Sequence, residues 1–491
     1  MTVKLTDTFH IGRSDRYSTP ENSGEALPIV YGAVTGAAYK GLWKLPCIDT
    51  ANYVYCFADH EVLPFADGNA ISVYIDDELV DPADYAFDES NDYESLGAIA
   101  TVTFTVGVGA ATHYGPGLDD MTSGGTFTGD VKTHYYVKIT TAAATDKFDW
   151  SADGGVTWKA TAVAITGAAQ TLEEGVTVTF AATTGHTLND AWGFYARPSP
   201  VGKQVTAKGC GLCMSGTTTL MTGIVDMVLD FLVTHCGFLA ADVDTTASER
   251  AKQVVTTQGY IAAGVIIEDC VIWDKIIEMM GSFLGSAYVN GAGELVLSID
   301  DGTIQYDPTI LQRQDAELLD ARQRLVNLIN QCPYEHDYNY VTGEFDMATN
   351  AYPRRDTASV NMYGLRYPES AFQFFWCRDA TTVDAVCQLI IEKLAEPLYE
   401  IEVKDHTMKR LSVDVGDHIV YSALDLYDIE GLQMANHYWK IVEVSPDFRA
   451  GTMTFRALET PYYLTEQHLA DSSIKADGSH KAGNCRLSVT Y

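Results

Sequence analysis

Positive charge is scarce in this chain. Its 491 residues include 32 Lys and Arg against 66 Asp and Glu, which gives a formal net charge of −34 at pH 7. A surface of this sign repels phosphate, so we expect no docked nucleic acid. No lysine or arginine occurs between Leu45 and Val131, while carboxylates accumulate from Asp76 to Glu94. They indicate a solvated acidic face or the wall of an electronegative passage, because they lack the regular oxygen spacing of a calcium loop.

Long apolar runs are also missing. No stretch of about 18 or more apolar residues occurs, and the first segment, MTVKLTDTFHIGRSD, has no apolar core typical of a secretion signal. We therefore expect a protein that is made in the cytosol and is not inserted into a membrane.

The ten cysteines do not form a strong metal-binding pattern. Only Cys210 and Cys213 make a Cys-x-x-Cys pair, and no second close pair or histidine pair has zinc-binding spacing. Buried thiols that are reduced at synthesis are the favoured interpretation. A sulfur-bound cluster that also uses Cys236 or Cys270 is the alternative. We predict no cofactor and no metal.

Catalytic motifs are absent as well. The chain has no HExxH, GxSxG or phosphate-binding loop, and no GxGxxG with an acidic partner. A cell-wall muramidase needs a glutamate in a cleft near a second carboxylate, and no such arrangement is visible. We predict that the protein is not an enzyme; a peptidoglycan-cleaving enzyme is the least favoured hypothesis.

The first region, residues 1–115, is rich in predicted strands. With 491 residues and 46% hydrophobic residues, the chain is long enough to bury several cores. Strand patterns separated by Gly, Pro, Asp and Asn occur in YVYCFADHEVL, AISVYIDDELV and AIATVTFTVGV. These segments predict a small β-barrel or sandwich.

Residues 116–197 differ in amino-acid composition from the first region and are rich in Thr, Ala and Gly. Period-two segments such as THYYVKIT and GVTVTFAATTGHTLNDAWGFYA predict an inserted all-β module of the immunoglobulin-like or lectin-like kind. Its Ser151-x-Asp153-x-Gly155-x-Thr157-Trp158 motif matches the Asp-box, which we interpret as a tight turn, because side-chain oxygens satisfy backbone donors there. The module also carries three candidate sugar-stacking residues, which are Trp150, Trp158 and Trp192.

Residues 198–322 predict an α+β domain. Apolar residues recur at helical spacing from Leu220 to Leu232, with Gly237 placed to end the helix. A short helix is expected in DVDTTASERAKQ, and a further one in VIWDKIIEMMGSFLG with Asp269 as its N-cap. The hairpin SAYVNGAGELVLSIDDG follows, signalled by its Asn-Gly turn.

Residues 323–460 show a fixed order of elements. A strand (RLVNLINQCPYEHDY), the segment DTASVNMYG, a helix (TTVDAVCQLIIEKLAEP), the strand LSVDVGDHIVYS and the hairpin YWKIVEVSPDFRAGTMTFRALE follow one another, and residues 461–491 form a C-terminal tail. In LSVDVGDHIV we expect a barrel corner at Gly416. The hairpin has apolar residues on both faces, so it should be covered twice. The candidate interface residues are Trp439, Ile441, Val442 and Val444.

This series resembles the C-terminal half of bacteriophage tail-tip and baseplate hub proteins. Three segments carry the likeness: LPIVYG with the following LPCIDTANYVYCFADHEV, DTASVNMYG, and LSVDVGDHIV with its Val-Gly-Asp end. The inserted β-module resembles modules found in phage tail and virion proteins. The implied fold class is α+β and β-rich multidomain, with small tail-tube-like β-barrel domains, helix-on-sheet domains and an inserted all-β immunoglobulin-like module.

The resemblance also implies a function. Such hubs form a homotrimeric ring in the virion tail tip, in which related barrels produce pseudo-sixfold symmetry. The expected partners are a second and third copy, a distal tail or tail tube protein, the tape measure protein and a central fibre or spike. DNA would pass through without being specifically bound. The alternative hypothesis is a receptor- or glycan-binding tail protein.

Overall fold

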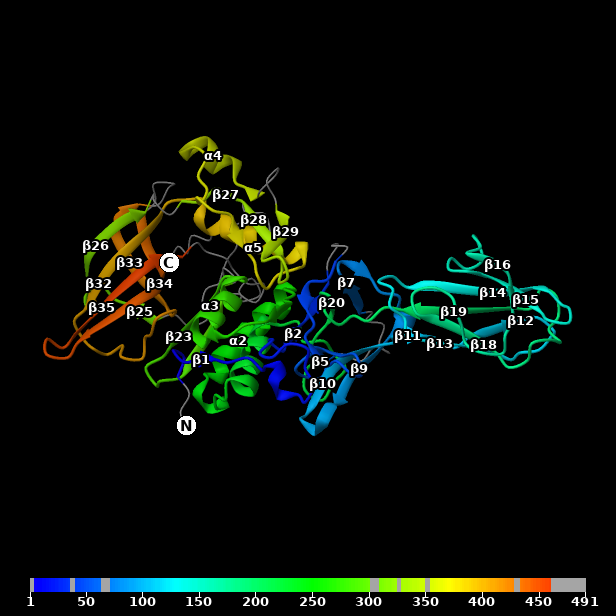
Figure 1. The fold of residues 1–491 in the computed structure, drawn as a ribbon. Coiled ribbons are helices and arrows are strands. Elements are labelled where there is room, and N and C mark those ends of the chain that lie inside the picture. Colours follow the sequence, from blue (N-terminus) through cyan, green and yellow to red (C-terminus); the bar gives the residue numbers. More distant parts are fainter. Residues whose placement is uncertain are drawn as a thin grey trace.

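The computed structural model describes residues 4–35, 40–62, 71–300, 309–324, 328–348, 354–427 and 433–460. The molecule is β-rich and multidomain, as predicted. It is elongated, with a C-terminal β-barrel at one end, the inserted β-module at the other, and an N-terminal β-domain and a helical domain between them (Figure 1). Within these ranges, no helix combines the length and apolar character needed to span a bilayer.

The N-terminal β-domain consists of two sheets around one core. One sheet has the order β5 (Cys47–Asp49), β6 (Val54–Ala58), β10 (Ala98–Phe104), β9 (Tyr85–Asp92). The other has the order β3 (Ala33–Val34), β20 (Val205–Cys210), β7 (Ser72–Ile75), β8 (Glu78–Leu79), and β4 (Trp43–Lys44) also pairs with β20. Every residue of β6 is buried, as expected for a strand covered on both faces.

Strand β20 lies beyond the inserted module in sequence but belongs to this first domain. It pairs antiparallel with β7 and with β4, and its Val205 and Ala207 are fully buried in the core of the N-terminal β-domain. The division expected at residue 198 therefore differs from the structure, because hydrogen bonding continues the first domain to Cys210. A long-range strand pairing of this kind leaves no local sequence signal.

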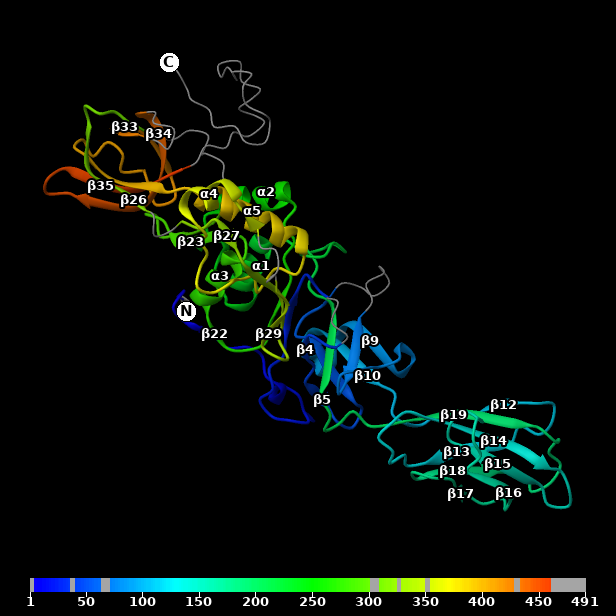
Figure 2. The same ribbon diagram turned by 90° about the horizontal axis from the view of Figure 1, so that it is seen from above.

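The inserted module is a two-sheet sandwich. One sheet has the order β11 (Gly107–Val108), β19 (Ala191–Arg197), β14 (Thr133–Thr141), β15 (Lys147–Ser151), β16 (Ala160–Ala164), and β12 (Thr112–Tyr114) also pairs with β19. The other has the order β13 (Met121–Gly125), β18 (Val176–Phe180), β17 (Gln170–Thr171). Aromatic residues fill the space between the sheets, and the module projects away from the remainder of the chain (Figure 2).

The helical domain gathers segments from distant parts of the sequence around one core. Its helices are α1 (Ile224–Asp230), which continues as a π-helical turn over Phe231–His235, α2 (Thr245–Gln258), α3 (Ile272–Gly281), α4 (Thr357–Tyr363) and α5 (Ala380–Leu394). Its hairpin joins β23 (Gly285–Val289) to β24 (Leu295–Ile299), as expected. Short pairings join β1 (Thr8–Phe9) to β22 (Cys270–Val271), β2 (Ile29–Tyr31) to β21 (Gly264–Ile266) and β27 (Gln331–Cys332) to β30 (Arg354–Arg355). Strand β28 (Tyr334–Asn339) lies between β29 (Glu344–Ala348) and β31 (Phe372–Gln373).

Three of the five α-helices that the structure describes begin with an aspartate N-cap. Asp244, Asp356 and Asp379 accept hydrogen bonds from backbone amides at the starts of α2, α4 and α5. Asp269, the predicted N-cap of α3, does not cap it, because Val271 holds that position. The Asp269 carboxylate instead accepts hydrogen bonds from the backbone amide of Ile11 and the guanidinium of Arg13.

The C-terminal β-barrel has the strand order β25 (Thr309–Leu311), β33 (His418–Tyr427), β34 (Gln433–Asp447), β35 (Thr452–Glu459), β32 (Leu398–Asp405), β26 (Ala316–Arg324). The two end strands, β25 and β26, are consecutive in the chain, so the sheet curves back toward itself. The strand expected from residue 411 begins only at His418, and Leu411 is exposed. Gly416 has a φ of 93° in the preceding turn, where the corner was expected.

This barrel and the helical domain divide the last third of the chain between them. Residues such as Trp376 and Ile390 are buried in the same core as α1 and α3. Strands β25 and β26, from before residue 325, complete the barrel with strands that follow α5. The single domain expected at 323–460 is therefore split.

The points where the chain leaves and rejoins the N-terminal β-domain lie side by side. Gly107 pairs with Arg197 and Val108 pairs with Ala196 across β11 and β19. Cross-strand partners are about 5 Å apart, so the module is connected to the N-terminal β-domain through one pair of neighbouring strands.

Removing the module should therefore leave the rest folded. We expect that joining Gly107 to Arg197 through a two-residue Gly-Ser linker gives a soluble protein whose far-UV circular dichroism is lost cooperatively on heating. A matched deletion that extends to Cys210 removes β20 and should not fold. If both deletion variants fold, or if neither folds, the assignment of β20 to the N-terminal β-domain is wrong.

Candidate functional site

Two of the three predicted sugar-stacking residues are core residues. Trp192 is fully buried and Trp150 is 8% exposed, both in the interior of the module. The Trp192 indole donates a hydrogen bond to Asp119 (3.1 Å), and its ring packs edge-on against Phe180. Neither ring can offer a face to a sugar, so the prediction is wrong for both. Trp158 is 39% exposed and remains a candidate.

The Asp-box residues form the turn that the sequence predicts. The Ser151 hydroxyl accepts hydrogen bonds from the amides of Asp153 and Gly155 (3.1 and 3.0 Å). The Asp153 carboxylate accepts from the amides of Val156 and Thr157 (3.0 and 2.8 Å). The hydroxyls of Ser151 and Thr157 hold the pKa of Asp153 well below its usual range. The side-chain oxygens of Ser151, Asp153 and Thr157 are thus all used to shape the turn.

The turn also folds back onto strand β14. The amide of Gly154 donates to the carbonyl of His134 (2.9 Å), and a side chain at Gly155 would meet the Tyr136 ring at 3.1 Å. As a result Trp158, at the end of the turn, lies beside Tyr136, with 6.4 Å between ring centroids. The Asp-box therefore positions an exposed aromatic ring next to the outer face of the sheet.

The outer face of this sheet carries a continuous group of rings, here called the aromatic strip: Tyr114, His134, Tyr136, Trp158 and Tyr195. His134 and Tyr195 stack at 4.3 Å with an interplanar angle of 18°. A side chain at Gly193 would meet His134, Tyr114 and Tyr136 within 3.6 Å, so these three rings surround one glycine. Tyr114 and Tyr195 are 53% and 40% exposed. Period-two alternation in THYYVKIT is the signal that could have indicated it.

Three cations border the aromatic strip. Lys132 and Arg197 lie 4.8 and 5.6 Å from the centroid of the Tyr195 ring. Both also bind the buried Asp84 of the N-terminal β-domain, at 2.6 and 2.5 Å. Lys138 follows Tyr136 on the same face of β14. The first two cations therefore anchor the base of the module, and Lys138 lies further out.

A buried histidine ties three loops of the module together. The His186 side chain is fully buried, and its two ring nitrogens face Asp146 (2.9 Å) and Asp120 (2.8 Å). Burial alone would lower the pKa of His186, but hydrogen bonds and charges from Asp120 and Asp146 outweigh it and raise the pKa. Burial opposes the charged form of Asp146 too, but hydrogen bonds from Ala143 and His186 lower its pKa.

The predicted interface residues of the barrel have mixed positions. Trp439 and Ile441 are buried in the barrel's own core, and the Trp439 indole donates to the carbonyl of Tyr421 (3.1 Å). A β-bulge at Val442 shifts the register, so Val444 faces the core opposite Phe455. Only Val442 remains half-buried on the outer face. The assignment of Trp439 and Ile441 to a subunit interface is therefore wrong, while that of Val442 and of the partly buried Val444 stays a prediction.

Part of the outer face of β34 is already covered by the same chain. Lys440 pairs with Asp300 at 3.5 Å, and Asp300 also pairs with Lys393 of α5. These ion pairs hold the barrel against the helical domain. The apolar residues of the barrel that remain more exposed include Ile310 (62%) and Leu319 (47%), on the end strands β25 and β26.

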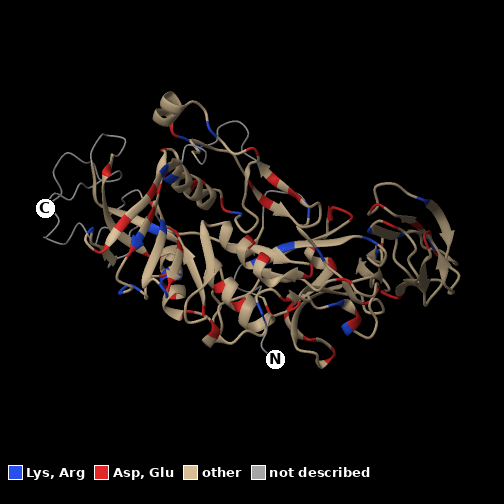
Figure 3. Cartoon of the chain, turned by 90° about the vertical axis from the view of Figure 1, so that its left-hand side faces the viewer, with Lys and Arg blue, Asp and Glu red and all other residues tan. Residues whose placement is uncertain are grey.

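The acidic segment from Asp76 to Glu94 lies at the surface of the N-terminal β-domain. Edge strand β9 alternates strictly, with Asp88 and Asp92 exposed. Charged residues on an edge strand also oppose pairing with other strands. Figure 3 shows carboxylates on every part of the chain, with fewer Lys and Arg. The structure thus fits a solvated acidic face, with Asp84 as a buried exception.

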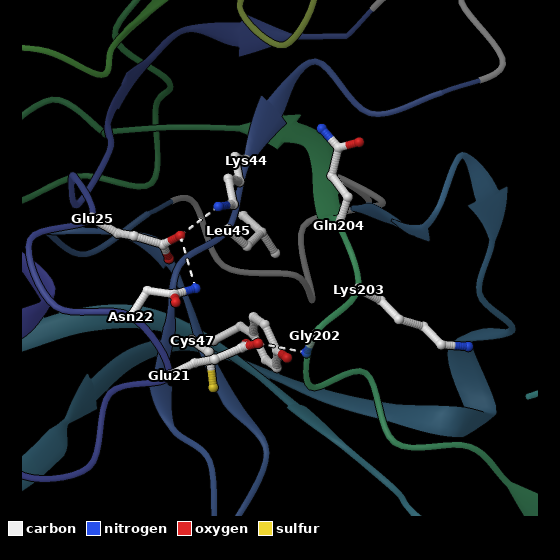
Figure 4. Close-up of a pocket in the computed structure, with 10 residues that line it drawn as sticks. Glu21, Asn22, Glu25, Lys44, Leu45, Cys47, Gly202, Lys203 and Gln204 are labelled. Atoms are coloured by element: carbon white, nitrogen blue, oxygen red, sulfur yellow. Dashed lines mark hydrogen bonds and ion pairs between the residues drawn. The ribbon is translucent and has the colours of Figure 1, made fainter.

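A polar pocket of about 490 Å³ lies where the chain returns from the module (Figure 4). The amide of Gly202 donates to Glu21 (2.5 Å), and Lys44 pairs with Glu25. Burial raises the pKa of Cys47 in its wall to about 11, which keeps this thiol protonated and unreactive. The charged groups of the pocket that face one another are paired.

The Cys210 and Cys213 thiols lie near each other at the end of β20. Burial, reinforced by Cys213, raises the pKa of Cys210, which opposes the thiolate form that metals bind. Across the ranges that the structure describes, no three His, Cys, Asp or Glu side chains are arranged to hold a metal ion.

Comparisons with known proteins give only distant similarities. No family model and no curated protein matches the chain. Solved structures similar to it include the tail protein from Neisseria meningitidis MC58, at 11% identity and a TM-score of 0.28, which covers 67% of this chain and 92% of that one. The 43 kDa tail protein of prophage MuSo2 from Shewanella oneidensis has 10% identity and a TM-score of 0.27, covering 70% and 99%. TM-scores this low do not establish a shared fold.

Trp439 should be required for the stability of the barrel. We expect Trp439→Ala to lower the free energy of unfolding of the barrel by about 3–5 kcal/mol, because it empties a fully buried site and removes the indole hydrogen bond to the Tyr421 carbonyl. Urea unfolding followed by tyrosine and tryptophan fluorescence measures this. Phe448→Ala, at a 74% exposed position of the same barrel, is the control. If Trp439→Ala destabilises the barrel as little as Phe448→Ala does, Trp439 is not buried in the core.

The His186 contacts should make the module less stable in alkali. The pKa of His186 is raised on folding, so its contribution is fully present below the unfolded value near 6.5 and is lost as pH rises through the folded pKa. We expect the melting temperature of the module to fall as pH rises above about 6.5, and His186→Gln to reduce this slope. Scanning calorimetry at several pH values measures it. An unchanged slope in the variant would show that His186 is not the titrating group.

Proposed function

We propose that the chain is a structural hub of a bacteriophage tail tip or baseplate, which assembles as a homotrimeric ring. The observation that supports it best is the presence of two small β-domains with separate cores, the N-terminal β-domain and the C-terminal barrel, on either side of one helical domain. Three chains with two such domains each supply six β-domains. That number matches the sixfold symmetry of a tail tube, as the family resemblance implies.

The charge of the chain supports a conduit role. A ring that lets duplex DNA pass without retaining it should present carboxylates, because each Lys or Arg on its wall adds attraction for phosphate. The chain has about two carboxylates for every cation. In this proposal DNA passes through the ring and is not specifically bound.

The exposed apolar residues of the barrel supply a contact for a neighbouring copy. Ile310 and Leu319 lie on β25 and β26, the two end strands of the barrel sheet. An exposed sheet edge with apolar side chains favours association. In a closed threefold ring this contact is heterologous, because different surfaces of each copy meet.

The remaining partners follow from the same role. The ring would join a tail tube or distal tail protein, with the tape measure protein, on one side and a central fibre or spike on the other. The role is structural and needs no catalytic residue or cofactor. Its place would be the tail tip of the virion.

The oligomeric state tests this proposal. We expect the purified protein to have three times the 53.7 kDa mass of one chain, measured by native mass spectrometry. Ile310→Glu should shift it to monomers that keep the far-UV circular dichroism spectrum of the folded chain, because a carboxylate buried at the contact stays unpaired. Val156→Glu, at an 80% exposed position in the module, is the matched control. A stable monomer, or an open filament that does not close at three, would refute the hub.

A further inference from the structure

We propose that residues 461–471 of this chain dock on an exposed surface of its helical domain, here called the α4 surface: Arg355, Met362, Leu365, Arg366 and Tyr367. The inference goes beyond the hub function and does not rest on it. The α4 surface lies at the periphery of the helical domain, on α4 and the segments that flank it (Figures 1 and 2). Residues 461–471 lie outside the described ranges, so the contact is inferred from their sequence and their point of attachment.

The α4 surface exposes three large apolar side chains within six residues. Met362, in α4, is 71% exposed, and Leu365 and Tyr367, in the segment that follows, are 46% and 56% exposed. Elsewhere in the described ranges, no six consecutive residues expose three such side chains. Single exposed apolar residues are normal on a protein surface, whereas a cluster indicates a surface that another segment covers.

The backbone of this surface is held in place by a buried side chain. The Asn330 amide group donates a hydrogen bond to the Gly364 carbonyl (2.8 Å) and its oxygen accepts one from the backbone amide of Arg366 (2.7 Å). A segment that docks here therefore meets a preformed surface, which limits the entropy lost on binding.

The chain leaves the barrel close to the α4 surface. At the end of β35, the Glu459 carboxylate accepts a hydrogen bond from the amide of Tyr399 (2.9 Å). Tyr399 is four residues beyond Ala395, a separation of at most about 14 Å. The Ala395 carbonyl in turn accepts a hydrogen bond from the hydroxyl of Ser359 in α4. Residues 461–471 therefore start within roughly 20 Å of α4, and in extended form they span up to about 36 Å.

The two arginines of the α4 surface contact neutral oxygens. Arg355 donates a hydrogen bond to the side-chain oxygen of Gln331 (2.8 Å), and Arg366 donates one to the carbonyl of Tyr363 (3.4 Å). Neither contact neutralises the charge of the guanidinium. A docked carboxylate can therefore pair with either arginine.

The carboxylates near this surface do not cancel its charge. Residues 354–370 contain three arginines and two carboxylates, in a chain that has about two carboxylates for every cation. Asp356 caps the start of α4, and Arg354 pairs with Asp384. The remaining exposed carboxylate of this range is Glu369. The α4 surface is therefore locally cationic within a strongly acidic protein.

Residues 461–471 have the matching composition. Their side chains charged at pH 7 are Glu466 and Asp471, and the first Lys or Arg after Thr460 is Lys475. Their large apolar side chains are Tyr462, Tyr463, Leu464 and Leu469. Exposed ion pairs add little free energy, so the apolar contacts supply most of the affinity and the charges set the orientation of the segment.

Attachment to the same chain makes a weak contact sufficient. A short flexible linker gives an effective concentration on the order of 1 mM. A contact with a dissociation constant of about 0.1 mM between separate molecules would then be occupied about nine-tenths of the time.

Methionine oxidation in the full-length protein tests the proposal. Dilute hydrogen peroxide converts an accessible thioether to its sulfoxide, and peptide mass spectrometry measures each site. Met347, 47% exposed on β29, is the internal reference for the 71% exposed Met362. Without cover, Met362 would oxidise at least as fast as Met347. We expect it to oxidise about fivefold to tenfold more slowly, because docking leaves it accessible about a tenth of the time.

Substitutions in the docking segment should remove this protection. Leu469→Ser should speed the oxidation of Met362 about fivefold, because it deletes one apolar contact. Leu487→Ser, the same change outside residues 461–471, is the matched control and should leave the rate unchanged. Glu466→Arg and Arg366→Glu should each speed the oxidation about twofold, and the two together should restore the protection.

Three results would overturn the proposal. The first is oxidation of Met362 in the unaltered protein as fast as that of Met347. The second is slow oxidation that Leu469→Ser does not change. The third is slow oxidation that is lost on dilution, because the cover would then come from a neighbouring copy.

Discussion

The pairing of β20 with β7 and β4 is the interaction on which the arrangement of the molecule depends. This strand follows the module in sequence and precedes the helical domain, and it is hydrogen-bonded within the first sheet of the chain. The hydrogen bonds of β20 to β7 and β4 therefore fix the chain both where it leaves the module and where it continues to the helical domain. Unpaired, it would expose buried backbone groups of β7 and open the core around Trp43 and Phe57, which is energetically expensive. A strand of six residues therefore contributes to the placement of both the module and the helical domain.

Charge acts in two opposite ways in this protein. Most carboxylates are solvated and keep the chain strongly negative, which favours solubility and repels polyanions. Asp84 is different, because it is buried between domains and binds both Lys132 and Arg197. Removing either cation would leave part of a buried charge unpaired, so the orientation of the module depends on this small network. Salt therefore screens the solvated surface carboxylates more than it screens the ion pairs of the buried Asp84.

Local patterns in the sequence predicted local structure well. Alternation identified the strands of the module and the 438–459 hairpin, helical spacing identified α1, α3 and α5, and the Asp-box turn formed as expected. Long-range relations were not predictable. Whether Trp192 or Trp158 faces solvent depends on which sheet covers the strand, and β20 shows that sequence order does not set domain membership. The bulge at Val442 reversed the side of Val444, since one extra residue changes the face of every residue after it.

The same limits apply to the candidate site. The Asp-box was recognised as a turn, but its role in positioning Trp158 required the contact with β14. The rings of the aromatic strip come from four separate segments, which the pairings of β19 with β14 and β12 and the Asp-box turn bring together. Gly193 was the residue hardest to identify from the sequence, because it contributes by having no side chain.

The adjacency of Gly107 and Arg197 has a consequence for how such a protein can change over generations. A domain that begins and ends at one antiparallel pair is a self-contained cassette, and recombination can exchange it without disturbing the register of the sheet it hangs from. The surface that meets the environment can therefore diversify while the scaffold stays constant. The same position would accept a foreign domain whose own termini are close together, making the chain a natural carrier for displayed ligands.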